Sequence, residues 1–536
     1  MTINKITCTA LFLSLGIHAI SQSNAPEAPK ATLELQWQHA DLTNDKLFGV
    51  SAQKAYNELL KGKKPSPIIV AVLDSGTETF HPDLNKNIWM NTDEIPSNGI
   101  DDDKNGYIDD VHGWSFIGGK DGDVRGDNLE FTRIYKDLKD RFDQKDAASI
   151  SSEEKKEYEK YLSFKKQYED RVAKSKEEKA QYDQFIMFYS MADAAMKGAT
   201  GKEKYTVEDL KAIQSKDEMT VQFQTVMIQL MEGGIIDQLE DWRNQVEDQV
   251  NYSYNLELDT RKIVGDNYAD PRERIYGNNH IDGPAAEHGT HVAGIIGATA
   301  NGFGIDGICP TAQLMIVRCV PAGDERDKDV ANAIRYAVDN GAKIINMSFG
   351  KAYSPQKQVV DEAVQYAESK GVLLIHAAGN DGKNIDVKDN FPTKIYNNKK
   401  SCSTWMEIGA SDSDPSKLAA SFSNYGKKEV DVFAPGVDVY STMTNNTYKK
   451  NSGTSMASPV TAGVAAALWS YYPQLTAQQV KEILEKSAVK HKGKVPLPGS
   501  ATEEKPEGKS VSFKKLSRTG GVVNLYEAVK LAEKYK

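Results

Sequence analysis

The sequence predicts an α/β fold, a three-layer sandwich with a mostly parallel sheet, that carries a separate α-helical insertion. Two observations predict the sandwich: short, continuous apolar runs recur along the chain, and segments with helical periodicity lie between them. A third observation, a long stretch of mixed charge in the middle of the chain, predicts the insertion.

The apolar runs have the length of strands and lack polar alternation, which is typical of strands covered on both faces. They occupy residues 68–74, 314–320, 343–349, 372–380 and 429–436. In the segments 330–340 and 359–370, apolar residues recur at steps of three and four, which predicts helices. Ligands of such sheets bind beyond the carboxyl ends of the strands, where Asp74, Asn346 and Asn380 fall.

Residues 127–270 differ in composition from the rest of the chain. Over 152–196, charged residues of both signs alternate with aromatic and aliphatic residues at helical spacing, which predicts one long helix. A capping box at Thr206 and a further pattern over 221–250 complete an expected insertion of three to five helices. A second polar stretch, residues 491–517, has no periodicity and predicts a loop.

Composition excludes several classes of protein. Of the 536 residues, 39% are hydrophobic and 26% are charged, so collagen-like and wholly disordered chains are excluded. Lys and Arg total 66 against 76 Asp and Glu, and the net charge of -10 argues against nucleic acid as a partner, because nucleic acid demands a basic face. No phosphate-binding loop or redox pair is present in the sequence, so no organic cofactor is expected.

Residues 1–21 have the pattern of a secretory signal peptide. Lys5 supplies positive charge, residues 6–20 form a short apolar stretch, and Ala19 and Ser21 provide a small-x-small cleavage site. We expect an exported protein, whether secreted, periplasmic or on the cell surface, with an uncleaved anchor as the alternative. The stretch is too short for a spanning helix and no later one is apolar enough, so we expect no stable membrane span.

The segment between the cleavage site and the first strand is too short for a propeptide that assists folding, so we expect folding without one. Removal of the signal peptide leaves Cys309, Cys319 and Cys402, which allow one disulfide at most and do not have the spacing of a zinc site. A disulfide framework is therefore not expected to hold the fold.

Three segments each join a reactive side chain to glycines or small residues that let the backbone come close. They are AVLDSG with Asp74, EHGTHVAGIIGA with His288 and NSGTSMASPVTAGVAAAL with Ser455. Singly, these side chains could cap a helix or bond within the core. Together they form a chemical set, because a hydroxyl needs an imidazole to take its proton and the imidazole needs a carboxylate to orient it.

In this order and with these flanks, the segments resemble the subtilisin family of serine proteases. HPDL at 81–84, NMSFG at 346–350 and HAAGND at 376–381 extend the resemblance, which covers residues 40–126 and 271–536. The resemblance implies a subtilisin-like fold and a serine endopeptidase that hydrolyses protein or peptide substrates through an acyl-enzyme intermediate.

The resemblance also implies a triad, a side-chain donor to the oxyanion and a strand that pairs with the substrate backbone. The residues are Asp74, His288 and Ser455 for the triad, Asn380 for the donor, and Ser348, Phe349 and Gly350 for the strand. The asparagine also fits this role on its own chemistry, because an amide at a strand end beside a glycine can point at an oxygen that gains charge.

Alternative interpretations fit the sequence less well. A non-catalytic binding protein on a protease scaffold would usually have lost one of the four reactive groups, and all four are present here. A lipase or esterase is less favoured, because no G-x-S-x-G motif surrounds Ser455. His291 follows His288 at a spacing that could face a metal, but without an HExxH pattern we expect it to pack in the core.

The expected organisation is a signal peptide over 1–21, an N-terminal part of the catalytic domain over 22–126, the insertion over 127–270 and the remainder of the catalytic domain over 271–536. The insertion emerges between the triad aspartate and histidine. We therefore hypothesise that it lies near the rim of the cleft and restricts access or binds a partner. A decorative, solvated arm is the alternative.

The segment SNGIDDDKNGYIDDVHGW has oxygen ligands at alternate positions and a glycine at the turn, as in a D-x-D-x-N-G calcium loop. It predicts a structural Ca²⁺ ion, with an acidic turn without metal as the alternative. The predicted ligands are Asp101, Asp103, Asn105, Tyr107 and Asp109. His112 stands where such loops carry a bidentate glutamate, so the last ligand is either Asp110 or a residue from elsewhere.

Overall fold

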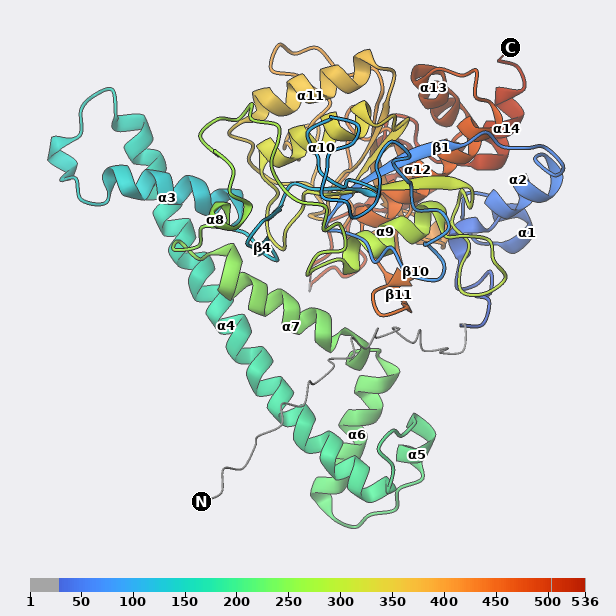
Figure 1. Ribbon diagram of the computed structural model, residues 1–536. Coiled ribbons are helices and arrows are strands. Elements are labelled where there is room, and N and C mark those ends of the chain that lie inside the picture. Colours follow the sequence, from blue (N-terminus) through green and yellow to red (C-terminus); the bar gives the residue numbers. More distant parts are fainter. Residues whose placement is uncertain (1–27, 503, 536) are drawn as a thin grey trace, which may run out of the picture.

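The computed structural model describes residues 28–502 and 504–535, so the predicted signal peptide lies outside the described residues. A nine-stranded sheet lies between two layers of helices, and a helical arm extends away from this body (Figure 1). The predicted α/β architecture with a mostly parallel sheet and a helical insertion is confirmed.

The strands of the sheet come from widely separated parts of the chain. Their bounds are β1 (Ile68–Asp74), β2 (Gly113–Ser115), β5 (Ala312–Arg318), β6 (Ile344–Met347), β7 (Leu373–Ala377), β8 (Trp405–Ser411), β9 (Val432–Pro435), β12 (Val489–Lys490) and β15 (Gly521–Val522). The order in the sheet is β12-β15-β9-β8-β7-β6-β1-β5-β2. Every neighbouring pair is parallel except β12 with β15.

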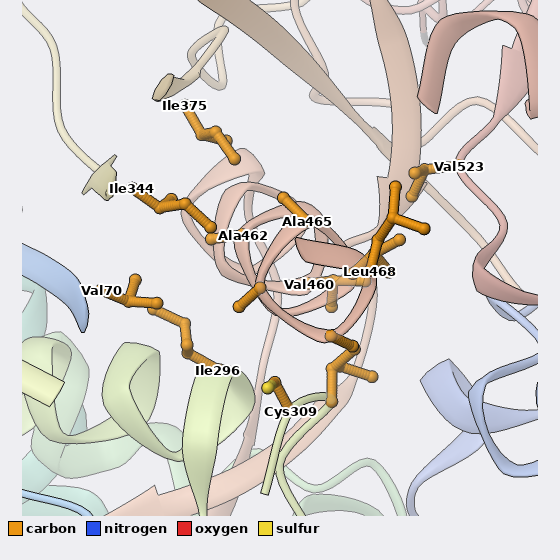
Figure 2. Packing of buried hydrophobic residues seen from close by; sticks show 14 of the residues in the cluster. Val70, Ile296, Cys309, Ile344, Ile375, Val460, Ala462, Ala465, Leu468 and Val523 are labelled. Atoms are coloured by element: carbon orange, nitrogen blue, oxygen red, sulfur yellow. The ribbon is translucent and has the colours of Figure 1, made fainter. Parts of the chain in front are cut away.

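Successive side chains of a strand point to opposite faces of the sheet, so each helical layer packs on its own hydrophobic core. Val70 belongs to one core, with α9 and α12, and Ala71 belongs to the other, with α10 and α11. Figure 2 shows the first of these cores, where Val70, Ile344 and Ile375 of the sheet face α12. The helices are α9 (Glu287–Gly297), α12 (Thr454–Tyr471), α13 (Ala477–Ser487) and α14 (Leu525–Ala532) on one face, and α10 (Asp327–Asp339) and α11 (Lys357–Ser369) on the other.

Small residues let α12 run through the middle of its layer. Ala457, Ala462 and Ala465 are fully buried. A Cβ atom at Gly463 would lie 2.5 Å from the Cβ atom of Ile308, so only glycine permits this approach. The close packing holds the first turn of α12 at the carboxyl edge of the sheet.

The insertion contains six α-helices, one more than the upper expectation, because two of them are only four and five residues long. They are α3 (Glu130–Phe142), α4 (Lys155–Thr200), α5 (Val207–Lys211), α6 (Glu218–Glu232), α7 (Leu239–Asp248) and α8 (Arg261–Val264). The long predicted helix is α4, continuous over 46 residues. The capping box of Thr206 with Asp209 is present at α5.

One expectation for the C-terminal region was wrong. The predicted loop at 491–517 contains β13 (Lys494–Pro496) and β14 (Ser510–Ser512), which pair antiparallel. Each strand has three residues, too few for a periodic pattern, and their pairing is supported by burial of Val495 at 1% exposure.

Two further expectations concern cysteines and membranes. Cys309, Cys319 and Cys402 are buried and free, so disulfides do not hold the fold within the described residues. In the part of the chain that the structure describes, no helix has the length and apolar character needed to cross a bilayer.

Candidate active site

The topology brings the seven predicted catalytic and substrate-binding residues to one cleft. Asp74 ends β1, Ser348 follows β6 and Asn380 follows β7, and these three strands are neighbours in the sheet. His288 and Ser455 are each the second residue of a helix, α9 and α12. All of them, with Phe349 and Gly350, line a cleft of about 1320 Å³.

A short hydrogen bond joins the carboxylate to the imidazole. Nδ1 of His288 lies 2.7 Å from Oδ1 of Asp74, which also accepts the backbone N–H of Ser75 at 2.8 Å. Asp74 is buried, whereas the His288 side chain is 42% exposed. Burial lowers the pKa of His288, but the Asp74 charge outweighs it, so the net pKa lies above 6.5. A carboxylate at Nδ1 fixes the proton there and leaves Nε2 as the basic nitrogen.

The residue after the histidine must be glycine for this contact to form. A Cβ atom at Gly289 would lie 2.0 Å from the carbonyl oxygen of Gly76 and 3.2 Å from the Cβ atom of Asp74. Any side chain at this position would push α9 away from the end of β1. The glycine in the segment EHGTH therefore serves the contact between the two triad segments.

The serine hydroxyl lies in the first turn of α12, half-buried at the cleft. It donates to the carbonyl oxygen of Ser348 at 2.9 Å, and the Ser348 hydroxyl donates to the carbonyl oxygen of Ser455 at 2.9 Å. Asn346 donates to the Ser348 hydroxyl at 3.0 Å. Within the described residues, the Ser455 hydroxyl thus donates to the segment that follows β6 and not to His288.

The amide of Asn380 is oriented by Thr454, a residue that the sequence reasoning missed. Oδ1 of Asn380 accepts the backbone N–H and the hydroxyl of Thr454, both at 2.9 Å. The Thr454 hydroxyl in turn accepts the backbone N–H of Gly379 at 3.0 Å. Because the amide oxygen is held, its NH₂ group is turned to the opposite side and remains a donor.

The predicted calcium loop brings together a different set of carboxylates. Oxygens of Glu94, Asp101 and Asp103 lie within 4.8 Å of one another, which suits ligands of one cation. Glu94 lies outside the motif and was missed, because no spacing rule connects it to the loop. It is buried, and its carboxylate accepts backbone N–H groups of the loop.

The other loop residues make protein contacts. The Asp109 carboxylate accepts the backbone N–H groups of Asn98 at 3.1 Å and Gly99 at 2.9 Å. The side-chain NH₂ of Asn105 donates to the carboxylates of Asp103 at 3.0 Å and Asp110 at 3.1 Å. The N–H of Tyr107 donates to the Asn105 side chain at 2.7 Å. Asp110, the alternative last ligand, is buried and accepts the Tyr336 hydroxyl at 2.6 Å.

His291 is buried, as its packing interpretation predicts. Its Nε2 lies 3.0 Å from the carbonyl oxygen of Lys449, and burial lowers the pKa of the ring to about 3. The ring is therefore neutral near pH 7 and attaches α9 to β11 (Thr447–Asn451), the second strand of a hairpin with β10 (Val439–Met443).

The returning part of the insertion also lines the cleft. Helix α7 lies between α4 and the body of the molecule (Figure 1). The insertion residues at the cleft are Gly234, Gln238, Glu240, Asp241, Asn244 and Asp248. Sequence reasoning placed the insertion near the cleft because its ends flank the triad, but it could not identify α7 as the helix at the rim.

Comparisons with known proteins identify a family and several relatives of this chain. A family model described as the subtilase family matches residues 66–510. A thermostable alkaline protease of Halalkalibacterium halodurans is 40% identical over 202 residues, 38% of this chain and 52% of the relative. Subtilisin DY of Bacillus licheniformis is 40% identical over 205 residues, 38% of this chain and 70% of the relative.

A thermophilic serine proteinase of a Bacillus species is 40% identical over 227 residues, 42% of this chain and 51% of the relative. The chain thus spans about half the length of two of these three curated relatives. Among solved structures, a mutant of the protease domain of PatA has a TM-score of 0.37 and 26% identity, and the match covers 48% of this chain and 83% of that one.

Proposed function

Because the family model covers residues 66–510, the chain belongs to the subtilase family, and we propose that it is a serine endopeptidase with Ser455 as its nucleophile. One observation carries this proposal: a buried carboxylate orients an imidazole, by a hydrogen bond of 2.7 Å, in the same cleft as a serine at a helix start. This arrangement supplies the orienting acid, the base and the nucleophile of acyl transfer.

In the proposed reaction, the Ser455 hydroxyl leaves its acceptor on Ser348 by rotation about its Cα–Cβ bond and turns to Nε2 of His288. His288 takes the proton as the oxygen attacks a peptide carbonyl, and Asp74 stabilises the imidazolium. The oxyanion receives hydrogen bonds from the Asn380 NH₂ group and from the Ser455 N–H at the start of α12. His288 then protonates the leaving amine, and water attacks the acyl-enzyme by the reverse steps.

A fluorophosphonate probe tests this proposal, since it labels only an activated serine. We expect stoichiometric labelling of the wild type, none of Ser455→Ala, and normal labelling of a control variant, Ser452→Ala, whose hydroxyl contacts Asp438. Loss of the nucleophile should lower kcat on a denatured protein by on the order of a million-fold. Equal labelling or hydrolysis by wild type and Ser455→Ala would contradict the proposal.

The proposed substrates are proteins or peptides bound in extended form along Ser348, Phe349 and Gly350. Their position supports this proposal. All three line the cleft, and Ser348, directly after β6, accepts the Ser455 hydroxyl with its carbonyl oxygen. An extended peptide can pair with such a strand end through backbone hydrogen bonds.

We also propose that a Ca²⁺ ion binds at the acidic loop. Asp101 and Asp103 would hold it with Glu94, because their oxygens lie within 4.8 Å and hard cations prefer carboxylates. Asn105 and Asp109 would complete the set only after rearrangement, since their side chains contact the protein, and Tyr107 would contribute its backbone carbonyl oxygen. The ion would neutralise and rigidify the loop and take no part in the reaction.

Export and domain organisation complete the proposal. The charged, apolar and small-residue parts of residues 1–21 support a signal peptide, and sequencing the mature N-terminus tests it. A catalytic domain built from 22–126 and 271–536 is supported by the sheet, whose nine strands all lie outside the insertion at 127–270.

A further inference from the structure

Helix α7 has two chemically distinct faces. Leu239 and Val246 are buried, and Trp242, on the same face, contacts Tyr182 and Phe185 of α4 with ring centroids 5.1 and 5.4 Å apart. The residues that line the cleft recur at the three- and four-residue steps of one helical face. They are Glu240, Asp241, Asn244 and Asp248, and we call them the acidic face of α7.

Ion pairs hold this face beside the segment that carries the triad histidine. Asp241 pairs with Lys449, whose carbonyl oxygen accepts from His291 one turn after His288. Asp248 lies 4.0 Å from Arg125, which also donates to the carbonyl oxygen of Pro284 at 2.7 Å, just before α9. The acidic face therefore forms a wall of the cleft on the His288 side.

Negative charge gathers at this wall. Glu287, next to the triad histidine, also lines the cleft. Burial raises the pKa of Asp248, and the negative charges of Glu247 and Glu287 raise it further, against Arg125. Arg243 lies 3.4 Å from Glu240 but is 48% exposed, so water screens this pair.

The cleft as a whole also carries an excess of negative charge. Its cationic side chains are Arg125, Lys449 and Lys450, and the first two already face carboxylates of α7. Its carboxylates are Asp74, Glu240, Asp241, Asp248, Glu287, Glu325, Asp381 and Asp438. An acidic excess remains after omission of Asp74, which binds His288, and Glu325, whose pKa burial raises to about 8.

We propose that the acidic face of α7 selects substrates, favouring extended peptide segments with lysine or arginine close to the scissile bond. The inference rests on the proposed function, since it assigns a substrate class to the same cleft. A cleft with one sign of charge concentrates ligands of the opposite sign, and carboxylates at its wall discriminate against acidic side chains.

The test measures binding, so that it does not depend on hydrolysis. The affinity of Ser455→Ala is measured for fluorescent peptides that carry a lysine and for matched peptides that carry a glutamate at the same position. This position is varied over the four residues on either side of one central peptide bond. We expect the lysine peptide to bind about tenfold more tightly at one or more positions, as two carboxylates at the cleft wall can provide, and we expect 1 M salt to abolish the preference.

Two matched double variants locate the effect. Glu240→Gln with Asp248→Asn should reduce the preference to threefold or less, because it removes two charges from the acidic face. Glu203→Gln with Glu232→Gln removes two charges from the insertion outside the cleft lining and should keep the tenfold preference. Equal thermal midpoints of the two double variants would show that both are folded.

Two results would overturn the inference: equal affinity for lysine and glutamate peptides in Ser455→Ala, or a preference that survives in Glu240→Gln with Asp248→Asn. If that double variant does not fold, the lysine preference of Ser455→Ala is measured in 1 M salt instead, and a preference that survives the salt overturns the inference. Failure of fluorophosphonate labelling would instead overturn the endopeptidase proposal and leave these binding measurements interpretable.

Discussion

Thr454 acts on the proposed oxyanion donor from the position next to the nucleophile. Its hydroxyl accepts from Gly379 and donates to the amide oxygen of Asn380, so one side chain connects α12 to the segment after β7. The preorganisation of a donor matters because a donor that must reorient during the reaction stabilises the transition state less. We therefore regard Thr454 as a positioning residue.

Thr454→Val keeps the shape of the side chain and removes both of these hydrogen bonds. We expect kcat to fall by about tenfold with little change in KM, because an imperfectly held Asn380 still donates, whereas Asn380→Ala should lower kcat by about 100 to 1,000-fold. Steady-state kinetics on a short peptide measure both. Wild-type kcat in Thr454→Val, or a change confined to KM, would show that the threonine does not position the donor.

The pH dependence of the reaction should reflect the environment of His288. The imidazole accepts a proton only when neutral, so kcat/KM should rise with pH through the pKa of His288. Burial lowers this pKa but the Asp74 carboxylate raises it more, so the midpoint of the rise should lie above 6.5. Asp74→Asn removes the charge and should move the midpoint of the residual activity to lower pH. A wild-type midpoint below 6.5 would contradict this reasoning.

At the scale of elements, continuous apolar runs predicted β1, β5, β6, β7 and β9, because both faces of these strands are covered. The strand β8 was missed, since its run WMEIGAS carries Glu407 in mid-strand. The structure satisfies this carboxylate with the ring of His376 at 2.9 Å and the indole N–H of Trp405 at 2.9 Å. A polar residue paired inside the core has no local signature in sequence.

Some residues of the candidate site could be predicted from their own segment of sequence, and others could not. The triad segments could be predicted because each carries its reactive residue together with the glycines its backbone needs. Glu94 could not be predicted, because no spacing rule connects it to the loop. The acidic face of α7 could not be predicted either, because it reaches the cleft through tertiary packing over long separations. A reactive residue that lies beside the glycines it needs can be recognised within one segment of sequence. A residue that reaches the site only when the chain folds cannot.

The acidic loop allows a prediction about stability. A ligand that binds only the folded state stabilises it by about 2.7 kcal/mol at 100 times its dissociation constant, so Ca²⁺ should raise Tm and a chelator should lower it. Asp101→Asn with Asp103→Asn should abolish the response, because it removes two of the three carboxylates in the group. Asp121→Asn, an exposed aspartate outside the group, is the control. A Tm unaffected by the chelator would refute calcium binding at this loop.

At the scale of the whole molecule, the insertion is joined to the cleft by buried charges. Lys351, directly after the cleft-lining residue Gly350, pairs with Glu130 of α3 at 2.8 Å and with Asp327 at 2.9 Å. Arg133 of α3 also pairs with Glu130 at 2.7 Å. A deletion that begins at residue 130 would therefore remove one of the two carboxylates that pair with the buried Lys351, and lost activity in such a protein would report on the core and not on α7.

Lys351→Met tests this junction. Removing one partner of a buried pair leaves uncompensated charge, so we expect the free energy of unfolding to fall by about 3 to 5 kcal/mol. Lys211→Met, which breaks an exposed pair with Glu232, should lower it by at most about 1 kcal/mol. Chemical denaturation of the two variants measures the difference, and equal effects would mean that the base of the insertion is not fixed by these charges.

Acid should weaken the same junction without any substitution. Burial favours the neutral form of Glu130, but Arg133 and Lys351 outweigh it and lower its pKa from 4.5 to about 2. A carboxylate with a depressed pKa stabilises the folded state above its unfolded pKa, so this contribution is complete above pH 4.5 and is lost as the pH falls towards 2. Wild type should therefore lose more stability over this interval than Glu130→Gln, measured by denaturation at each pH. Parallel losses in the two proteins would show that the charge of Glu130 does not stabilise the junction.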